Sequence, residues 1–155
     1  MSDDINDFLF GSGGKAFPFE KMGDQVTGEI IGMKKQQQTE PDSGKPKFFD
    51  SGDPMMMIVV TLQTDLHDDD EDDGVRNVYL RAGKYVVADG KGSAGLVAVR
   101  DAVKRSGSDK GIEVGGRLTL AYTGHGPKKG AFNPAKLYTA SYKPAVSNID
   151  LEEMV

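Results

Sequence analysis

The stretch MMMIVVTLQTDLHDDDEDDGVRNVYLR, residues 55–81, decides the fold. Its first part, residues 55–64, is almost entirely apolar, which is typical of a strand covered on much of both faces. Its last part, Val75–Arg81, alternates apolar and polar residues as a half-buried strand does. Residues 65–73 between them include seven acids. The stretch therefore predicts two consecutive strands joined by a charged turn.

Apolar periodicity continues this pattern on both sides of the stretch. Before it, Gly28 and Gly32 interrupt a strand-like segment and permit the bulge or bend that a small barrel requires. After it, apolar residues recur at three- and four-residue spacing, with Ser93 as the expected N-cap and Gly107 as the expected stop. The predicted elements are strands 25–35, 55–64 and 75–81, a helix over 93–105, and strands 117–123 and 135–143.

Three strands, a helix and two strands is the chain order of the OB-fold. We therefore predict an all-β fold, a five-stranded OB-fold Greek-key barrel with one short helix between strands 3 and 4. The expected organisation is a flexible N-terminal arm at 1–19, an OB-fold nucleic-acid-binding domain at 20–144 and an acidic C-terminal tail at 145–155. Both termini are expected to be flexible and acidic, and Phe17 and Phe19 to pack beside the barrel.

The net charge of −5 conceals a basic body. Residues 1–10, 65–73 and 145–155 contain 13 of the 24 acids and none of the 19 Lys and Arg residues. The rest of the chain therefore has 11 acids and a net charge of +8. Because electric fields decay over about 10 Å in ordinary salt, this body can attract an anionic partner despite the overall sign.

Composition also excludes several classes of protein. The chain has no cysteine, which excludes disulfides, thiolate zinc sites and cysteine nucleophiles. No apolar run approaches the ~20 residues that a membrane helix needs, and the N-terminus is acidic rather than signal-like. We therefore expect a cytoplasmic protein with no membrane partner.

Basic and aromatic residues gather in the two connections that flank the ligand-binding face of an OB-fold, and in the strands beside them. Basic groups neutralise phosphates, and aromatic rings stack on unpaired bases at about 1–3 kcal/mol each. The candidate nucleic-acid-binding residues are Lys34, Lys35, Lys45, Lys47, Phe48, Phe49, Arg76, Tyr79, Arg81, Lys84, Tyr85, Lys128, Lys129, Phe132, Tyr138 and Tyr142.

Each of these signals has a purely structural alternative. Rings at strand spacing serve equally well as core residues, and loop lysines commonly serve solubility. His67 among its acidic neighbours is typical of a solvated turn, because consecutive carboxylates cannot all face one ion. No catalytic, metal-binding or cofactor-binding constellation is recognisable, so the chain is expected not to be an enzyme.

The C-terminal tail interleaves acids with apolar residues, a composition that can dock into a basic-rimmed apolar groove on a partner protein. An alternative of equal weight is an end that has no binding role. The candidate partner-binding residues are Ile149, Asp150, Leu151, Glu152, Glu153, Met154 and Val155.

The chain resembles the small OB-fold single-stranded DNA-binding proteins of actinobacterial phages, over roughly residues 20–143. The resemblance lies in the pattern and order of segments rather than in a strict motif. The matching segments are 26–33 with the run Gln36-Gln37-Gln38, then 59–64, 74–80, 96–104, 116–124 and Lys136-Leu137-Tyr138.

This resemblance implies sequence-independent coating and protection of single-stranded DNA in replication, recombination or repair, within a bacterial host cell. It also implies recruitment of replication or recombination proteins through the tail, and self-association into a homo-oligomer. RNA stays open as a ligand, because stacking and phosphate contacts work for either sugar. The alternative hypothesis is an acidic DNA mimic or interaction module that inhibits or recruits a nucleic-acid enzyme.

Overall fold

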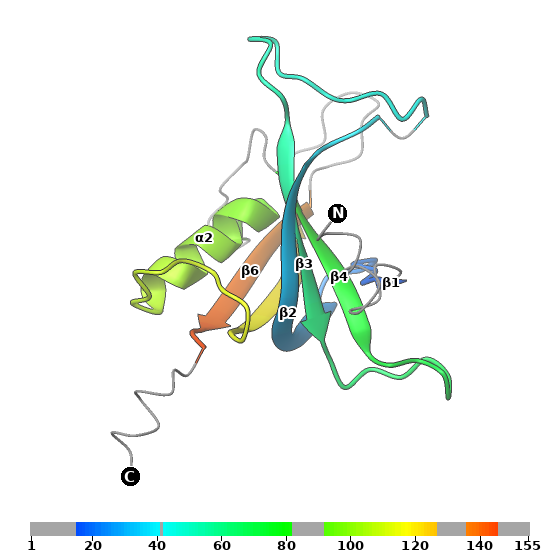
Figure 1. Ribbon diagram of the computed structural model, residues 1–155, viewed down its shortest axis with the longest axis vertical. Coiled ribbons are helices and arrows are strands. Elements are labelled where there is room, and N and C mark those ends of the chain that lie inside the picture. Colours follow the sequence, from blue (N-terminus) through cyan, green and yellow to red (C-terminus); the bar gives the residue numbers. More distant parts are fainter. Residues whose placement is uncertain (1–14, 41, 82–91, 127–135, 146–155) are drawn as a thin grey trace.

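The computed structural model describes residues 15–40, 42–81, 92–126 and 136–145, which contain six strands and one helix (Figure 1). In chain order these elements are β1 (Lys15–Ala16), β2 (Gln25–Gln37), β3 (Met56–Gln63), β4 (Val75–Arg81), α2 (Gly95–Arg105), β5 (Arg117–His125) and β6 (Lys136–Lys143). The mostly β class is confirmed, as is one short helix between the third and fourth of the predicted strands. Each predicted element overlaps an observed one.

The strands form one sheet in the order β1-β4-β3-β2-β5-β6. The pairs β2–β3, β3–β4, β2–β5 and β5–β6 are antiparallel, and β1 joins β4 in parallel. The predicted number of five strands is wrong, because residues 15–16 add a sixth. In the described part of the chain the sheet is open, and its two edge strands are β1 and β6.

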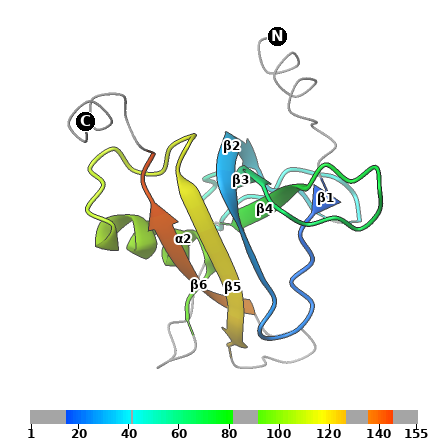
Figure 2. The ribbon, with the colours of Figure 1, turned by 90° about the horizontal axis from the view of Figure 1, so that it is seen from below.

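The core lies between the curved sheet and α2. The helix contributes Val99 and Ala102 to a cluster whose other members come mainly from β2 to β5. The helix packs against β6 and β4, and in Figure 2 it lies next to β6 and away from β1. Gly107, with a φ of 77°, follows its last turn as expected.

Ser93 is not the N-cap of α2. The N-cap is Ala94, which makes no capping side-chain hydrogen bond, and Ser93 instead pairs with Tyr138 on β6. Its N–H donates to the Tyr138 carbonyl at 2.9 Å, and the Tyr138 N–H donates back at 2.6 Å. The chain entering the helix is therefore anchored to β6.

Strand β2 bends as it crosses the sheet. Its first half pairs with β5 and its second half with β3, with a register shift between Ile30 and Gly32. At Gly28 the strands approach so closely that a Cβ would lie 2.4 Å from the Gln63 carbonyl oxygen. The expectation that these glycines permit a bend or bulge is confirmed.

The segment that follows β1 links β4 to the opposite edge of the sheet. The Phe17 N–H donates to the Asn77 carbonyl at 3.0 Å, beside β4. The Phe19 ring meets the Tyr138 ring edge-on at 5.2 Å, on β6. Phe17 and Phe19 pack against the core as predicted. Residues 15–19, within the range predicted as a flexible arm, therefore pack against the sheet.

Candidate nucleic-acid interface

One face of β2, β3 and β4 points away from the core and carries several of the predicted residues. Residues directly opposite each other in an antiparallel pair share a face, so the register defines two rows across the three strands. The rows are Lys34–Val59–Tyr79 and Gln36–Met57–Arg81. We call these six residues the outer face.

The centre of the outer face is a ring beside an apolar floor. Tyr79 is 37% exposed, and the guanidinium carbon of Arg81 lies 5.7 Å from its ring centroid. Val59, which lies directly opposite both Lys34 and Tyr79, is only 4% exposed although it is not part of the core cluster. Aromatic rings and arginine planes both stack on unpaired bases, and this pair offers one of each.

The two adjacent lysines of β2 do not share a face. Lys34 lies opposite Val59 and belongs to the outer face, whereas Lys35 lies opposite Ile58, which packs against the core. Both side chains are exposed. Strand alternation therefore places one of the two lysines on the same face as Tyr79 and the other on the reverse face.

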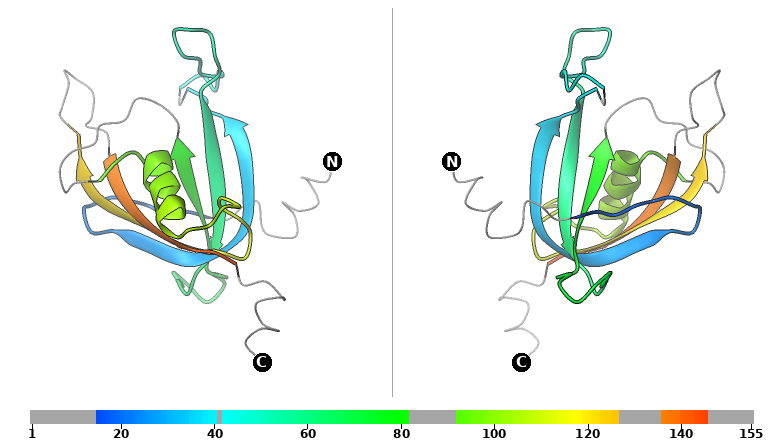
Figure 3. Two further views of the ribbon diagram at one scale, coloured as in Figure 1. Left: turned by 90° about the vertical axis from the view of Figure 1, so that its left-hand side faces the viewer. Right: turned by 90° about the vertical axis from the view of Figure 1, so that its right-hand side faces the viewer.

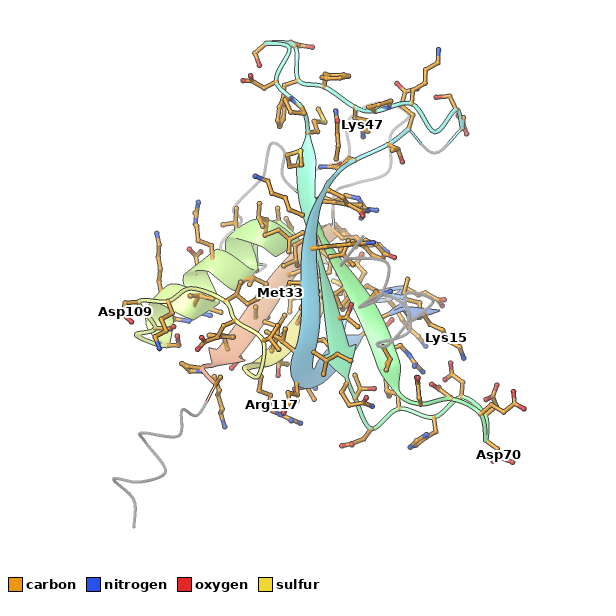
Figure 4. The ribbon with its side chains drawn as sticks, in the orientation of Figure 1. Lys15, Met33, Lys47, Asp70, Asp109 and Arg117 are labelled. Atoms are coloured by element: carbon orange, nitrogen blue, oxygen red, sulfur yellow. The ribbon has the colours of Figure 1, made fainter. Side chains whose placement is uncertain are left out.

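The connection between β2 and β3 continues this hairpin beyond the ends of the two strands (Figure 4). Isolated bridges pair Thr39 with Pro46 and Phe48 with Pro54, so the connection is a pair of bonded turns. The Phe48 ring is 56% exposed. The other candidates of this connection are Lys45, which is exposed, and Lys47 and Phe49, which are half-buried.

The acidic connection between β3 and β4 lies at the other end of these strands. In Figure 4, Lys47 marks the β2–β3 connection and Asp70 the acidic connection, at opposite ends of the hairpin strands. An antiparallel strand pair has its two connections at opposite ends by construction. The outer face is therefore continuous with the β2–β3 connection and separated from the seven acids of the β3–β4 connection.

Arg76, in β4, is bonded to the acidic connection and does not belong to the outer face. It is 3% exposed, and its two terminal nitrogens donate to both carboxylate oxygens of Asp72, at 2.9 and 2.6 Å. Asp68 lies 3.4 Å from the same guanidinium. Hydrogen bonding to Arg76 holds the pKa of Asp72 far below its usual range. The guanidinium is already fully paired, which removes it from the predicted set of phosphate contacts.

Two predicted tyrosines on β6 are also packed inside the molecule. Tyr142 is 5% exposed, its hydroxyl accepts the Glu113 N–H at 3.1 Å, and burial raises its pKa. Tyr138 is half-buried between Phe19 and Tyr122, and burial raises its pKa as well. Tyr142 is therefore assigned to packing, and Tyr138 packs against two other aromatic rings.

The remaining predicted residues lie outside the described residues. For the nucleic-acid set these are Lys84, Tyr85, Lys128, Lys129 and Phe132, and for the partner set they are the tail residues 149–155.

Sequence reasoning missed three members of the outer face, namely Gln36, Met57 and Val59. Met57 and Val59 stand in an apolar run that predicts a strand covered on much of both faces. Their position follows only from the pairing of β3 with both neighbours, because period-two alternation cannot reveal a face when both faces are apolar.

Within the described ranges, no group of three or more His, Cys, Asp or Glu side chains is arranged to hold a metal ion. The same ranges contain no helix that is long and apolar enough to span a membrane. Comparison of the whole chain with protein-family models, with curated proteins and with solved structures finds no match.

Proposed function

We propose that this protein binds single-stranded DNA without sequence preference, on the outer face and along the β2–β3 connection. The observation that carries the proposal is the row of Lys34, Val59 and Tyr79, with Arg81 against the ring. It combines a cation with an exposed stacking surface, and it faces away from the acidic connection.

The chemistry favours a single strand over a duplex. Stacking on Tyr79 requires a free base face, and a duplex keeps its base faces hidden. Lys34, Lys45 and Lys47 would neutralise phosphates of any sequence and release their counterions. Among the six residues of the outer face, Gln36 and Tyr79 alone have an uncharged side chain that can form a hydrogen bond. Few hydrogen bonds to base edges can therefore form there, which argues against sequence-specific recognition.

The strand pairing also supports this proposal at the level of the fold. In the order β4-β3-β2-β5-β6, strand β2 pairs with both β3 and β5. If β2 is counted as the first of five barrel strands, these are the second and the fourth, which is the pairing of a five-stranded Greek-key barrel. We infer an OB-like fold in which the N-terminal segment and α2 occupy the space between β4 and β6. In that fold the equivalent face holds oligonucleotides.

A titration of labelled oligo-dT and of a duplex of equal length tests the proposal. At about 50 and 200 mM salt we expect tighter binding to the single strand, and weaker binding at the higher salt. Tyr79→Ala should reduce affinity about tenfold through the loss of one stacked base, whereas Tyr79→Phe should retain most of it.

The two adjacent lysines provide a matched pair of charge variants. Lys34→Gln should weaken binding and lower the slope of log affinity against log salt by about 0.7, the value for one phosphate of a single strand. Lys35→Gln removes the same charge from the reverse side and should have a smaller effect. Equal effects of the two variants, or no preference for the single strand, would reject the outer face as the site.

A further inference from the structure

The ends of β5 and β6 hold a histidine and a lysine that lie apart from the outer face. His125 ends β5 and Lys136 begins β6, and the two are direct cross-strand partners. Both are exposed. Figure 3 shows this end of β5 and β6 on the same side of the molecule as the β2–β3 connection, with the acidic connection on the opposite side.

A buried tyrosine holds the His125 ring in place. The Tyr122 hydroxyl and the Nδ1 atom of His125 lie 2.9 Å apart, and the rings are 6.1 Å apart. Because Nδ1 is engaged by the hydroxyl, Nε2 is the ring nitrogen left for an external partner. The orientation of the imidazole is thus set before any ligand arrives, which lowers the entropic cost of a contact.

The Lys136 ammonium is held against the same tyrosine. Its Nζ atom lies 5.4 Å from the centroid of the Tyr122 ring and donates a hydrogen bond to the Phe19 carbonyl. An ammonium has three N–H donors, so this carbonyl leaves donors for another acceptor. A histidine and a lysine are therefore positioned on one buried ring.

An acidic side chain, Asp24, lies near this pair. Asp24 lies close enough to Lys136 and Lys21 for both to lower its pKa, although its bond to the Lys21 N–H is the larger cause. One of its oxygens, Oδ2, accepts the N–H groups of Glu20 and Lys21 at 2.9 and 3.0 Å. The carboxylate is therefore engaged as the cap of a turn.

We propose that His125 and Lys136 form a second phosphate site, which binds a backbone phosphodiester of the strand held on the outer face. This proposal rests on the proposed function. Imidazole gains its charge within the range of about pH 8 to pH 5, so this contact strengthens as the pH falls. The affinity for phosphate rises as the pH falls because the two equilibria are linked: a bound phosphate favours the protonated ring, and the protonated ring binds phosphate more tightly.

The test compares oligo-dT binding at about pH 8 and about pH 6, a range in which thymidine phosphodiesters and ordinary carboxylates keep their charge. The wild-type protein should bind about two- to fivefold more tightly at the lower pH, the range expected of an exposed charge pair. His125→Gln should abolish this dependence, and Tyr122→Phe should reduce it. His67→Gln is the matched control, because His67 is bonded to the Asp72 carbonyl in the acidic connection.

The chain has only two histidines, so NMR of their ring protons reports on the site directly. Oligo-dT should raise the titration midpoint of His125 and leave that of His67 unchanged. Inorganic phosphate, added alone, shows whether the site takes a free anion. If phosphate moves the His125 signal and bound oligo-dT does not, the strand contact is refuted.

Binding that is equal at both pH values, or a pH dependence that persists in His125→Gln, would overturn this inference while leaving the outer face as the proposed site. No binding of oligo-dT at either pH would overturn the proposed function and this inference together.

Discussion

At the scale of single residues, Asp72 and Arg76 make the most consequential contact among the described side chains. Asp72 accepts both guanidinium nitrogens and also the N–H groups of Asp68 and Gly74, at 2.7 and 2.9 Å. Asp72→Asn would remove the buried carboxylate that pairs with Arg76 and leave the exposed Asp68 as the acid beside it. We expect this variant to lower the thermal unfolding midpoint by at least several degrees, as measured by circular dichroism.

The same pair predicts a pH dependence of stability. The pKa of Asp72 is depressed in the folded state, so its carboxylate stabilises the fold at neutral pH. That contribution should be lost progressively below about pH 4, where the unfolded carboxylate binds a proton first. Asp70→Asn, in the exposed part of the same connection, is the control and should leave both the midpoint and its acid dependence close to wild type.

At the scale of elements, the bend in β2 depends on Gly28 far more than on Gly32. A Cβ at Gly28 would lie 2.4 Å from a backbone oxygen of β3, whereas at Gly32 it would meet only the Thr61 Cβ at 3.9 Å. Gly28→Ala should therefore cost about 1–3 kcal/mol of unfolding free energy through overpacking. Gly32→Ala should change it by much less, and urea denaturation of both variants measures the difference. Similar costs would show that close strand approach does not govern this bend.

The N-terminal segment shows why the boundary of an element is hard to predict. A two-residue strand has no periodicity, and Lys15 and Ala16 are both exposed. Its position comes from long-range contacts, namely the pairing with β4, the Phe19–Tyr138 ring contact and the Gly23 N–H bond to the Tyr122 carbonyl at 2.8 Å. Such contacts depend on partners more than fifty residues away in the chain.

At the scale of the whole molecule, the β2–β3 connection and the acidic β3–β4 connection lie at opposite ends of the hairpin strands. Because salt screens exposed charges beyond about 10 Å, the acidic connection should hardly affect a strand bound at the β2–β3 end. Replacing Asp69, Asp70 and Glu71 by amides should change oligo-dT affinity by less than about twofold at 0.15 M salt. Replacing Lys45 and Lys47 by glutamine should weaken it severalfold. A large gain from the acidic variant would mean that this connection competes for the site.

The sequence by itself determined the element order, most element bounds and the segregation of charge, because periodicity, turn residues and local composition are properties of short segments. It could not separate Tyr79 from Tyr142, or Lys34 from Lys35, as members of one surface. It also could not show that Arg76 is already paired.

Only the tertiary structure decided those points, together with the open six-stranded sheet and the outer-face position of Met57 and Val59. All of these features have the same physical reason. Which face a side chain shares, and which charge it meets, depends on strand register and on contacts between distant segments, and no local pattern contains that information.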